Sequence, residues 1–152
     1  MKLLQLEHIE FDVTVENKDA LFTYLANKLY DLNRVTGANE IKEALLKREK
    51  DISTGVGDGI GIPHTKDSSV LFPTVLYLRL KEVVPYEALD GISVKDVFCI
   101  VMPTSYNKEH LVILSKIAQA LLDETKAKLI RTEENKEVVF EALKKEIMSV
   151  WN

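Results

Sequence analysis

The stretch Ser53-Thr54-Gly55-Val56-Gly57-Asp58-Gly59-Ile60-Gly61-Ile62-Pro63-His64-Thr65 is the most unusual part of this 152-residue sequence. It holds four of the six glycines, at every second position from 55 to 61. Apolar side chains alternate with the glycines, which favours a partly packed segment over a flexible connector. Pro63 fixes its own φ and favours an extended Ile62, so His64 follows a stiffened strand end at a defined angle. The neighbouring glycines leave room for a bulky macromolecular partner to approach the His64 ring.

Two common glycine-rich motifs do not fit this stretch. A P-loop requires Gly-Lys-Ser or Gly-Lys-Thr after its spacer, and neither tripeptide occurs in the chain. A dinucleotide-binding fingerprint requires its third glycine at position 60 or 62, and both positions hold isoleucine. The glycines therefore do not indicate a nucleotide site of either kind.

On both sides of the stretch, the hydrophobic pattern changes between the period of a strand and the period of a helix. Alternating or continuous apolar residues predict strands at 9–15, 74–80 and 97–102. Helical spacing predicts helices at 20–29, 41–50, 108–123 and 138–147, with Asn17 and Asn107 as N-caps of the first and third. A turn-rich segment with Pro85, Asp90 and Gly91 separates the last two strands. This order predicts a single α/β or α+β domain, with a mixed sheet and helices packed on it.

The charge distribution argues against nucleic acid as a partner. The chain has 20 Lys and Arg against 24 Asp and Glu, a net charge of −4, and the two signs are interleaved. The sequence has no basic stripe of the kind that a phosphate backbone requires. Its densest charged segment, residues 123–146, is typical of a solvated helix face.

We expect a cytoplasmic protein with no direct membrane insertion. The longest apolar run, Val97–Met102, is far shorter than the roughly 20 residues that span a bilayer. The N-terminal apolar run ends too early for a signal peptide. The single cysteine, Cys99, excludes a disulfide within the chain and fits a reducing compartment. It lies inside a predicted apolar strand, which indicates a buried structural thiol.

The three histidines differ in their expected surroundings. His8 precedes the first strand and is expected to be a partly exposed strand-end residue. His110 falls in the first turn of the third helix, on the same face as Leu114 and Ile117, so it points toward the core or its rim. His64 and His110 both lie near the ends of elements, which favours a shared site.

Two such histidines suit phosphoryl transfer. A neutral imidazole is a nucleophile near neutral pH, and its attack on phosphorus gives a labile phosphoramidate. The transition state is loose, so the protein mainly positions the donor and offsets negative charge. His110 can donate a ring N–H, and the amides at the start of its helix can help to bind an anion. Arg48, at the end of the second helix, is the natural cation because a guanidinium matches phosphoryl oxygens, although alone it would be a solvated residue beside Glu49.

Six segments occur in order along most of the chain: Arg48-Glu49, 53–64, Leu78-Arg79-Leu80, Ala88-Leu89-Asp90-Gly91, Val97-Phe98 and Glu109-His110-Leu111. Together they resemble the enzyme IIA domains of the bacterial phosphoenolpyruvate-dependent sugar phosphotransferase system. The type is the fructose–mannitol one, which includes the nitrogen-regulatory branch. The Ile-Pro-His ending, followed downstream by a helix that begins with His-Leu, is the most specific part of the resemblance.

The resemblance implies a mixed sheet of roughly five strands flanked by helices, in a single enzyme IIA domain over residues 1–152. It implies that His64 accepts a phosphoryl group from the phosphocarrier HPr. His64 would then pass the group to a cysteine of a cognate enzyme IIB, which serves a membrane enzyme IIC. His110 matches the second active-site histidine, which stabilises phosphoryl oxygens, and Arg48 matches a basic residue near the site. No metal or organic cofactor is expected, and the length predicts a stand-alone carrier.

Two positions depart from the family pattern. Gly61 stands where the family usually has alanine, and the glycine costs little beyond backbone entropy. Thr65 stands where a small residue, often glycine, follows the histidine. Its hydroxyl and branch are expected beside the phosphoacceptor, where they would alter the fit of a partner or donate to the phosphate.

Three alternative functions stay open. A regulatory enzyme IIA would use its phosphorylation state to control partner proteins rather than to feed sugar uptake. A metal-dependent hydrolase would use His64, His110 and a carboxylate such as Asp58, although compact ligand spacings are missing from the sequence. A purely structural interaction module would leave the presentation of His64 by Pro63 without a purpose.

Overall fold

A long antiparallel pair of strands, β5 (Thr74–Val84) and β6 (Val94–Met102), forms the centre of the computed structural model. The structure describes residues 3–51, 53–86, 91 and 93–148. Successive side chains of these two strands enter two separate hydrophobic clusters, one on each face of the sheet. Leu76 and Cys99 face one cluster, whereas Tyr77 and Phe98 face the other and stack with ring centroids 4.5 Å apart. Both faces of the central pair are therefore covered.

Four shorter strands complete a mixed sheet of six strands, where the sequence predicted roughly five. They are β1 (Ile9–Val13), β2 (Gly55–Gly57), β3 (Ile60–Gly61) and β4 (His64–Lys66). β1 pairs in parallel with β5, β3 and β4 pair in parallel with β6, and β2 pairs antiparallel with β3. Between β3 and β4, the N–H of Ile62 donates to Thr54 O instead of to the sheet, and Pro63 has no N–H to donate. The edge beside β6 is therefore divided into two short strands.

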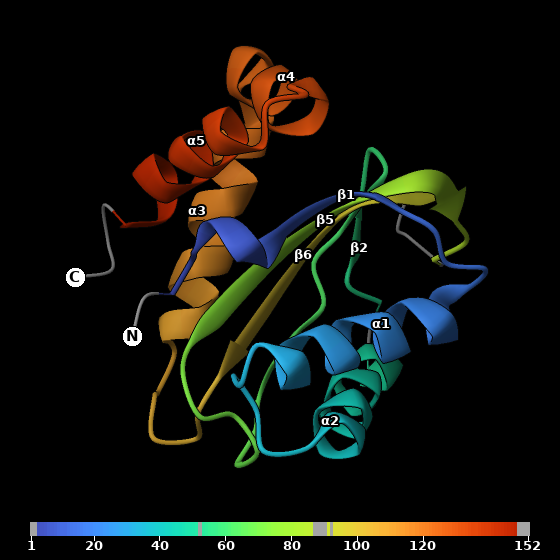
Figure 1. The fold of residues 1–152 in the computed structure, drawn as a ribbon, viewed down its shortest axis with the longest axis vertical. Helices are drawn as coiled ribbons and strands as arrows, with labels where there is room; N and C mark the ends of the chain where they lie inside the picture. Colours follow the sequence, from blue (N-terminus) through green and yellow to red (C-terminus); the bar gives the residue numbers. More distant parts are fainter. Residues whose placement is uncertain (1–2, 52, 87–90, 92, 149–152) are drawn as a thin grey trace.

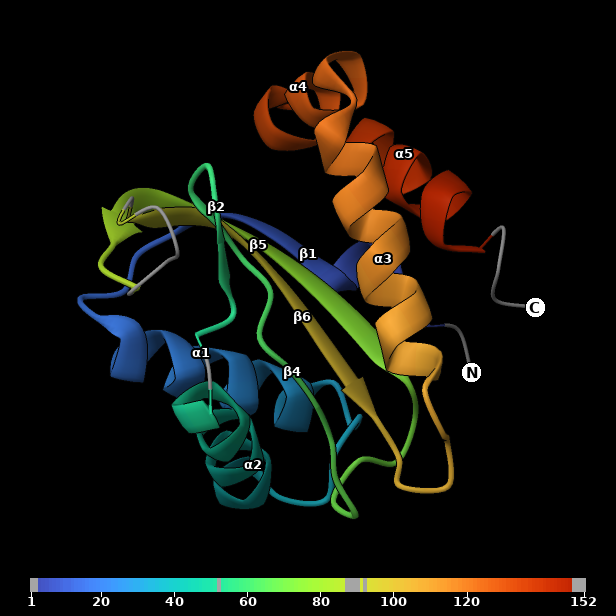
Figure 2. The same cartoon turned by 180° about the vertical axis from the view of Figure 1, so that it is seen from behind.

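The helices form an outer layer on each side of the sheet (Figures 1 and 2). One layer holds α1 (Lys18–Asp31) and α2 (Ala38–Asp51), and the other holds α3 (Glu109–Leu122), α4 (Glu124–Thr132) and α5 (Lys136–Met148). A short 3₁₀ turn, η1 (Leu6–His8), precedes β1. The layers confirm the predicted α/β domain with a mixed sheet. Within the described part of the chain, no helix is long and apolar enough to cross a bilayer.

The two predicted N-caps have different outcomes. The side chain of Asn17 accepts a hydrogen bond from the Ala20 N–H at 2.8 Å, which confirms it as the cap of α1. Asn107 is not the cap of α3, because that helix begins one residue later than predicted and its N-cap is Lys108. The backbone N–H of Asn107 instead donates to the Glu109 carboxylate at 2.9 Å.

The helix α4 was not predicted as a separate helix. Its segment is rich in charge and buries only Ile130, so few apolar side chains mark its inward face. Polar contacts hold it instead: Arg131 Nε lies 2.8 Å from the buried Asp96 carboxylate, and Arg79 donates to the carbonyls of Ile130 and Glu133. These partners are distant in sequence, so no local pattern could reveal them.

The two central strands are longer than predicted. The strand expected at 74–80 continues to 84, and the strand expected at 97–102 begins at 94. Residues 87–90 of the predicted turn segment, Asp90 among them, lie outside the described residues. Cys99 is fully buried, as predicted, and burial raises the pKa of its thiol to about 12.

Candidate functional site

The position of His64 follows from its pairing with the central strand. β4 runs parallel to β6 with His64 opposite Ile100, whose side chain packs on the α3 side of the sheet. The Ile100 N–H donates to the carbonyl of Pro63 at 3.0 Å, which fixes the backbone just before the histidine. β4 lies at a sheet edge between α2 and α3 (Figure 2). Because His64 is paired with Ile100, its side chain lies on the α3 side of the sheet.

A backbone contact selects the tautomer of His64. The ring nitrogen Nδ1 lies 2.7 Å from the carbonyl oxygen of Ile62, and a carbonyl can only accept, so Nδ1 carries the proton. The lone pair of the neutral ring is then on Nε2. Burial lowers the pKa of His64, the bond to Ile62 raises it, and the positive charge of Arg48 lowers it, with a lower value as the net result. His64 is consequently a neutral imidazole with Nε2 as its nucleophilic atom at neutral pH.

His110 lies beside His64, as the sequence predicted for a shared site. It is the second residue of α3 and half-buried at the rim of the core, and the two ring centroids are 6.1 Å apart with planes inclined by 38°. Its Nδ1 is buried and has no hydrogen-bond partner among the described residues. Burial, then the neighbouring His64 and Lys66, lower the pKa of His110. The start of α3 adds backbone N–H groups that favour an anion.

Two cations lie near the histidine pair. Arg48, half-buried near the end of α2, is close enough for its charge to lower the pKa of both His64 and His110. Lys66 follows His64 by two residues in β4, so the two side chains leave the same face of the strand. Its Nζ donates to the carbonyl of Tyr106 at 3.0 Å. The sequence analysis missed Lys66, although its spacing of two from His64 was a usable signal.

Glu49, next to Arg48, is a buried carboxylate and not a solvated partner. Its side chain is only 7% exposed, it accepts hydrogen bonds from Lys18 and Thr54, and the Tyr86 hydroxyl lies 3.3 Å from its Oε1. Burial raises the pKa of Glu49, but the bonds from Lys18 and Thr54 outweigh that effect and the pKa is lowered. No local sequence pattern predicts this cluster, because its members come from four separate segments.

The glycine-rich stretch forms a hairpin between β2 and β3, which the sequence analysis did not predict. Its central residues, Asp58 and Gly59, have φ of 54° and 78°, as a two-residue type I′ turn requires. An Asp-Gly pair between apolar residues was the available signal. Arg131 Nη2 donates to the carbonyl of Asp58 at 2.7 Å, so α4 holds the turn.

The metal-site alternative gains no support from this geometry. Asp58 is exposed at the tip of the hairpin, while His64 and His110 meet between β4 and α3. Among the described residues, no group of three or more His, Cys, Asp and Glu could hold a metal ion. The structure therefore brings the two histidines together without the third predicted ligand.

The surroundings of Gly61 and Thr65 differ from those expected from the sequence. A Cβ at Gly61 would lie 3.2 Å from the Tyr86 ring and 3.3 Å from Val94, so the glycine makes room for those two side chains. Thr65 pairs opposite Val101, which faces the α1 and α2 side, so its side chain leaves the face opposite to His64. The expected placement of its hydroxyl beside His64 is wrong, since the hydroxyl instead donates to the carbonyl of Lys66 at 3.3 Å.

His8 is separate from this site and fully buried, so its expected partial exposure is wrong. Its Nδ1 lies 3.1 Å from the carbonyl of Val75 in β5. The 3₁₀ turn η1 places the ring inward, and a period-two interpretation of the following strand could not anticipate that turn.

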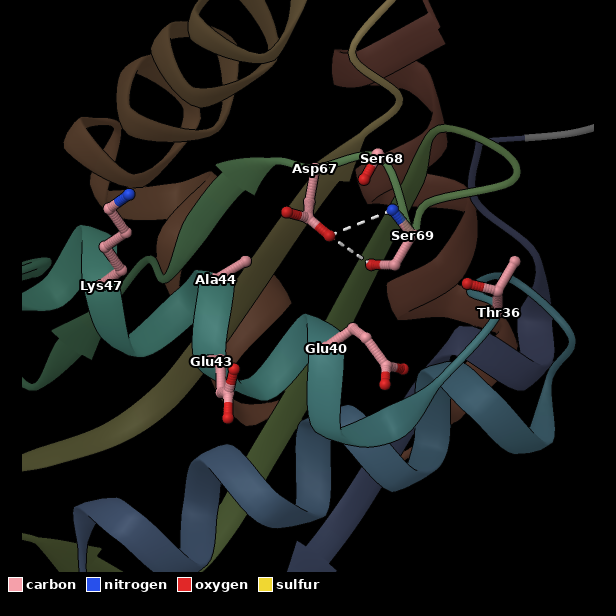
Figure 3. Close-up of a pocket in the computed structure, with 8 residues that line it drawn as sticks. All are labelled: Thr36, Glu40, Glu43, Ala44, Lys47, Asp67, Ser68 and Ser69. Atoms are coloured by element: carbon pink, nitrogen blue, oxygen red, sulfur yellow. Dashed lines mark hydrogen bonds between the residues drawn. The ribbon is translucent and has the colours of Figure 1, made fainter.

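A cavity of about 420 Å³ lies between α2 and the segment after β4 (Figure 3), and neither His64 nor His110 lines it. Three of its eight lining side chains are carboxylates, those of Glu40, Glu43 and Asp67, and one, Lys47, is a cation. The Asp67 carboxylate also accepts from the backbone and hydroxyl of Ser69, at 3.0 and 2.5 Å. An excess of carboxylates disfavours the binding of an anion in this cavity.

The histidine pair therefore combines a neutral nucleophile with nearby positive charge. Nε2 of His64 can attack an electrophile, and the cations Arg48 and Lys66 can offset negative charge that arrives with it. The start of α3 can bind anionic oxygens. These parts suit transfer of an anionic group through a covalent bond to His64.

Comparisons with known proteins find similar sequences and similar structures. The family model for "Phosphoenolpyruvate-dependent sugar phosphotransferase system, EIIA 2" matches residues 2–146. A fructose-specific EIIA component from Haloferax volcanii is 34% identical over 138 residues, which cover 91% of this chain and 90% of that protein. The nitrogen regulatory protein IIA-Ntr from Neisseria meningitidis superposes with a TM-score of 0.86 at 32% identity, covering 93% of this chain and 96% of that one. Enzyme IIAMTL from Escherichia coli, solved with phosphorylated enzyme IIBMTL, has the same fold, with a TM-score of 0.79 at 22% identity over 93% of this chain and 97% of that one.

Proposed function

The chain belongs to the EIIA 2 family of the phosphoenolpyruvate-dependent sugar phosphotransferase system, and on that basis we propose that it carries a phosphoryl group on Nε2 of His64. The observation that carries the proposal is the 2.7 Å contact between His64 Nδ1 and the carbonyl of Ile62. It leaves the nucleophilic lone pair on Nε2. Residues 1–152 act as one such carrier domain in this proposal.

The reaction has two transfers at the same nitrogen. In the first, the Nε2 lone pair attacks the phosphorus of phosphorylated HPr, and the bond from phosphorus to its donor atom in HPr breaks with its electron pair. In the second, a cysteine thiolate of an enzyme IIB attacks the same phosphorus, and the bond to Nε2 breaks. His64 returns to the neutral imidazole, so the protein is unchanged over the cycle. No metal or organic cofactor takes part.

The neighbouring residues offset charge during both transfers. Arg48 and Lys66 supply positive charge near the phosphoryl oxygens, and His110 donates a ring N–H to one of them. His110 does not become phosphorylated in this proposal, because its role is to stabilise the group on His64. The negative charge of a phosphoryl group on His64 would raise the pKa of His110, because it opposes the positive charges that lower this pKa in the unphosphorylated protein.

The partners follow from the relatives. The Escherichia coli relative was solved with a phosphorylated enzyme IIB, and the Haloferax volcanii relative is described as fructose-specific. We extend the first description to this chain as an acceptor, a IIB protein. The donor HPr and a membrane enzyme IIC linked to the IIB protein are the partners that the resemblance to the family implies. The exchange takes place in the cytoplasm, where phosphoenolpyruvate supplies the phosphoryl group.

Intact-mass spectrometry tests the proposal. The protein is incubated with phosphoenolpyruvate, enzyme I and HPr, beside a His64→Ala variant. We expect one acid-labile phosphoryl group on the wild type and none on the variant, and addition of an enzyme IIB should remove the group. Failure of the wild type to gain mass, with the partner proteins shown to be active, would overturn the proposal. Labelling of the variant would move the site to another residue.

A regulatory role is the second candidate. It is favoured by the 32% identity and the TM-score of 0.86 to a nitrogen regulatory protein, since this identity is close to the 34% identity to the fructose-specific relative. In that role the phosphorylated and unphosphorylated forms would bind different partner proteins. Loss of the phosphoryl group to an enzyme IIB within seconds favours transport, whereas a phosphorylated form that is stable in the presence of IIB proteins favours regulation.

A further inference from the structure

A continuous chain of hydrogen bonds joins Glu49 to the ring of His64. The Thr54 N–H and hydroxyl both donate to the Glu49 carboxylate, the first at 2.8 Å. The Thr54 carbonyl accepts from the Ile62 N–H at 2.9 Å. The Ile62 carbonyl accepts from Nδ1 of His64 at 2.7 Å. Two residues, Thr54 and Ile62, therefore separate the carboxylate from the nucleophile.

Neighbouring side chains hold the Glu49 carboxylate in place at one end of these hydrogen bonds. Lys18 Nζ lies 2.8 Å from Glu49 Oε2, and the Tyr86 hydroxyl lies 2.6 Å from the hydroxyl of Thr54. The Thr54 hydroxyl accepts from Tyr86, because its own proton is donated to Glu49. Lys18 and Thr54 together hold the pKa of Glu49 below its ordinary value in spite of burial. The buried Glu49 carboxylate is therefore an anion that accepts hydrogen bonds from Lys18 and Thr54.

We propose that Glu49 is a positioning residue, which fixes the orientation and the Nδ1–H tautomer of His64 through Thr54 and Ile62. This proposal deepens the proposed function, on which its kinetic part rests. Glu49 touches neither His64 nor a phosphoryl group in the proposal. It acts by holding Thr54, whose carbonyl in turn sets the position of the Ile62 peptide.

Thr54 can change the orientation of the His64 ring because Ile62 contacts both residues. The Ile62 N–H and the carbonyl of Ile62 are separated by its α-carbon, and Pro63 limits the rotation that follows. A shift of Thr54 therefore turns the Ile62 carbonyl away from Nδ1 of His64. Once that bond weakens, the imidazole can place its proton on Nε2, and the nucleophilic lone pair is lost from the reacting atom.

The test separates this orientation effect from the charge of Glu49. The negative charge of Glu49 raises the pKa of His64, so Glu49→Gln lowers that pKa by electrostatics alone. A charge effect leaves the tautomer of the neutral ring unchanged. Loss of the hydrogen-bond chain changes the tautomer, because a Gln amide has one acceptor oxygen where the carboxylate served two Thr54 donors and Lys18.

Long-range proton–nitrogen NMR spectra of the ¹⁵N-histidine-labelled protein report which ring nitrogen is protonated. We expect wild-type His64 to be protonated on Nδ1 above its pKa, and Glu49→Gln to shift a measurable fraction to Nε2–H. Glu43→Gln is the matched control, an exposed carboxylate on the same helix and outside the chain of bonds. This readout uses unphosphorylated protein, so it stands even where phosphoryl transfer fails.

Thr54 provides a second test that leaves the charge in place. Thr54→Val removes the hydroxyl and retains the shape, and Thr54→Ser keeps the hydroxyl and should restore the wild-type tautomer. In the phosphorylation assay, Glu49→Gln should slow acceptance by His64 between about 10-fold and 100-fold. An Nδ1–H tautomer retained in both Glu49→Gln and Thr54→Val would overturn the proposal. A shifted tautomer in a protein that is never phosphorylated would keep the positioning role and reject the proposed function.

Discussion

The imidazole rings of His64 and His110 lie 6.1 Å apart between centroids, with their planes inclined by 38°. Their separation is too large for a direct hydrogen bond between the rings and leaves space for a group attached to one of them. Each ring is neutral at neutral pH in the unphosphorylated protein, because burial and nearby positive charge lower both pKa values. A phosphoryl group on His64 would bring negative charge into this space, and a ring N–H of His110 can donate a hydrogen bond to one of its oxygens.

Replacement of His110 should separate loading from onward transfer. In His110→Ala, His64 keeps its nucleophilic Nε2 and still accepts a phosphoryl group from HPr. Transfer to an enzyme IIB should slow by about 10-fold to 1000-fold, because one donor to the phosphoryl oxygens is lost. Rapid-quench kinetics with phosphorylated protein measure this step. Gln119→Ala, an exposed substitution later in the same helix, serves as the control, and equal transfer rates in the two variants would remove His110 from the site.

Arg48 should control both the rate and the pH dependence of loading. Its positive charge contributes to the lowered pKa of His64, so Arg48→Ala raises that pKa toward 6.5. The acidic limb of the rate profile, where protonation removes the lone pair, should move to higher pH in the variant. The rate above this limb should also fall, because charge is no longer offset. Lys47→Ala removes the same charge at an exposed neighbouring position. An identical pH profile for both variants would show that Arg48 acts only as a surface charge and has no specific role in the site.

The main parts of the site could be predicted because each has a local signal. The Pro63 constraint indicated the presentation of His64, and helical spacing indicated the inward face that carries His110. The buried carboxylate of Glu49 had no such signal, since its partners Lys18 and Tyr86 come from distant segments. Burial that depends on long-range polar contacts cannot be deduced from the period of apolar residues alone.

The same distinction holds for the fold. The central strands and most helices follow from apolar periodicity, and the layers follow from the order of elements. The helix α4 is held by the hydrogen bond from Arg79 to the carbonyl of Ile130 and by the ion pair of Arg131 with Asp96. The pattern of apolar residues predicts neither contact. The hairpin was missed for another reason, because the turn signal of Asp58 and Gly59 was present but the glycines were interpreted as space for a partner.

Lys66 should contribute to loading through its charge. It leaves the same face of β4 as His64, and its ammonium is held by the carbonyl of Tyr106. Lys66→Gln retains a donor for that carbonyl but removes the charge, so acceptance from HPr should slow while Lys66→Arg stays near wild type. The pKa of His110 should rise in Lys66→Gln, since Lys66 is one of the charges that lower it. Histidine NMR titration measures this pKa, and an unchanged value together with an unchanged rate would place Lys66 outside the site.

Acid should destabilise the protein through His8, which is distant from the phosphoryl chemistry. Burial, followed by the positive charge of Arg34, lowers the pKa of His8 from 6.5 to about 4. The unfolded chain therefore binds a proton at His8 at higher pH than the folded chain does. The stability from the neutral ring is complete above pH 6.5 and is lost as the pH falls from 6.5 toward 4. The loss approaches about 3 kcal/mol in the free energy of unfolding at the acid end.

Urea unfolding at a series of pH values, for the wild type and His8→Gln, tests this dependence. The Gln amide does not titrate and can still donate to the carbonyl of Val75, which accepts from His8 in the native protein. His64 and His110 also have lowered pKa values and titrate in both proteins, so the difference between the two stability curves isolates His8. The wild-type curve should be the steeper one between pH 6.5 and 4.5, above the range in which most carboxylates titrate. Parallel curves over that range would show that the buried ring accepts its proton at no cost to folding, and His8 would then have no part in acid sensitivity.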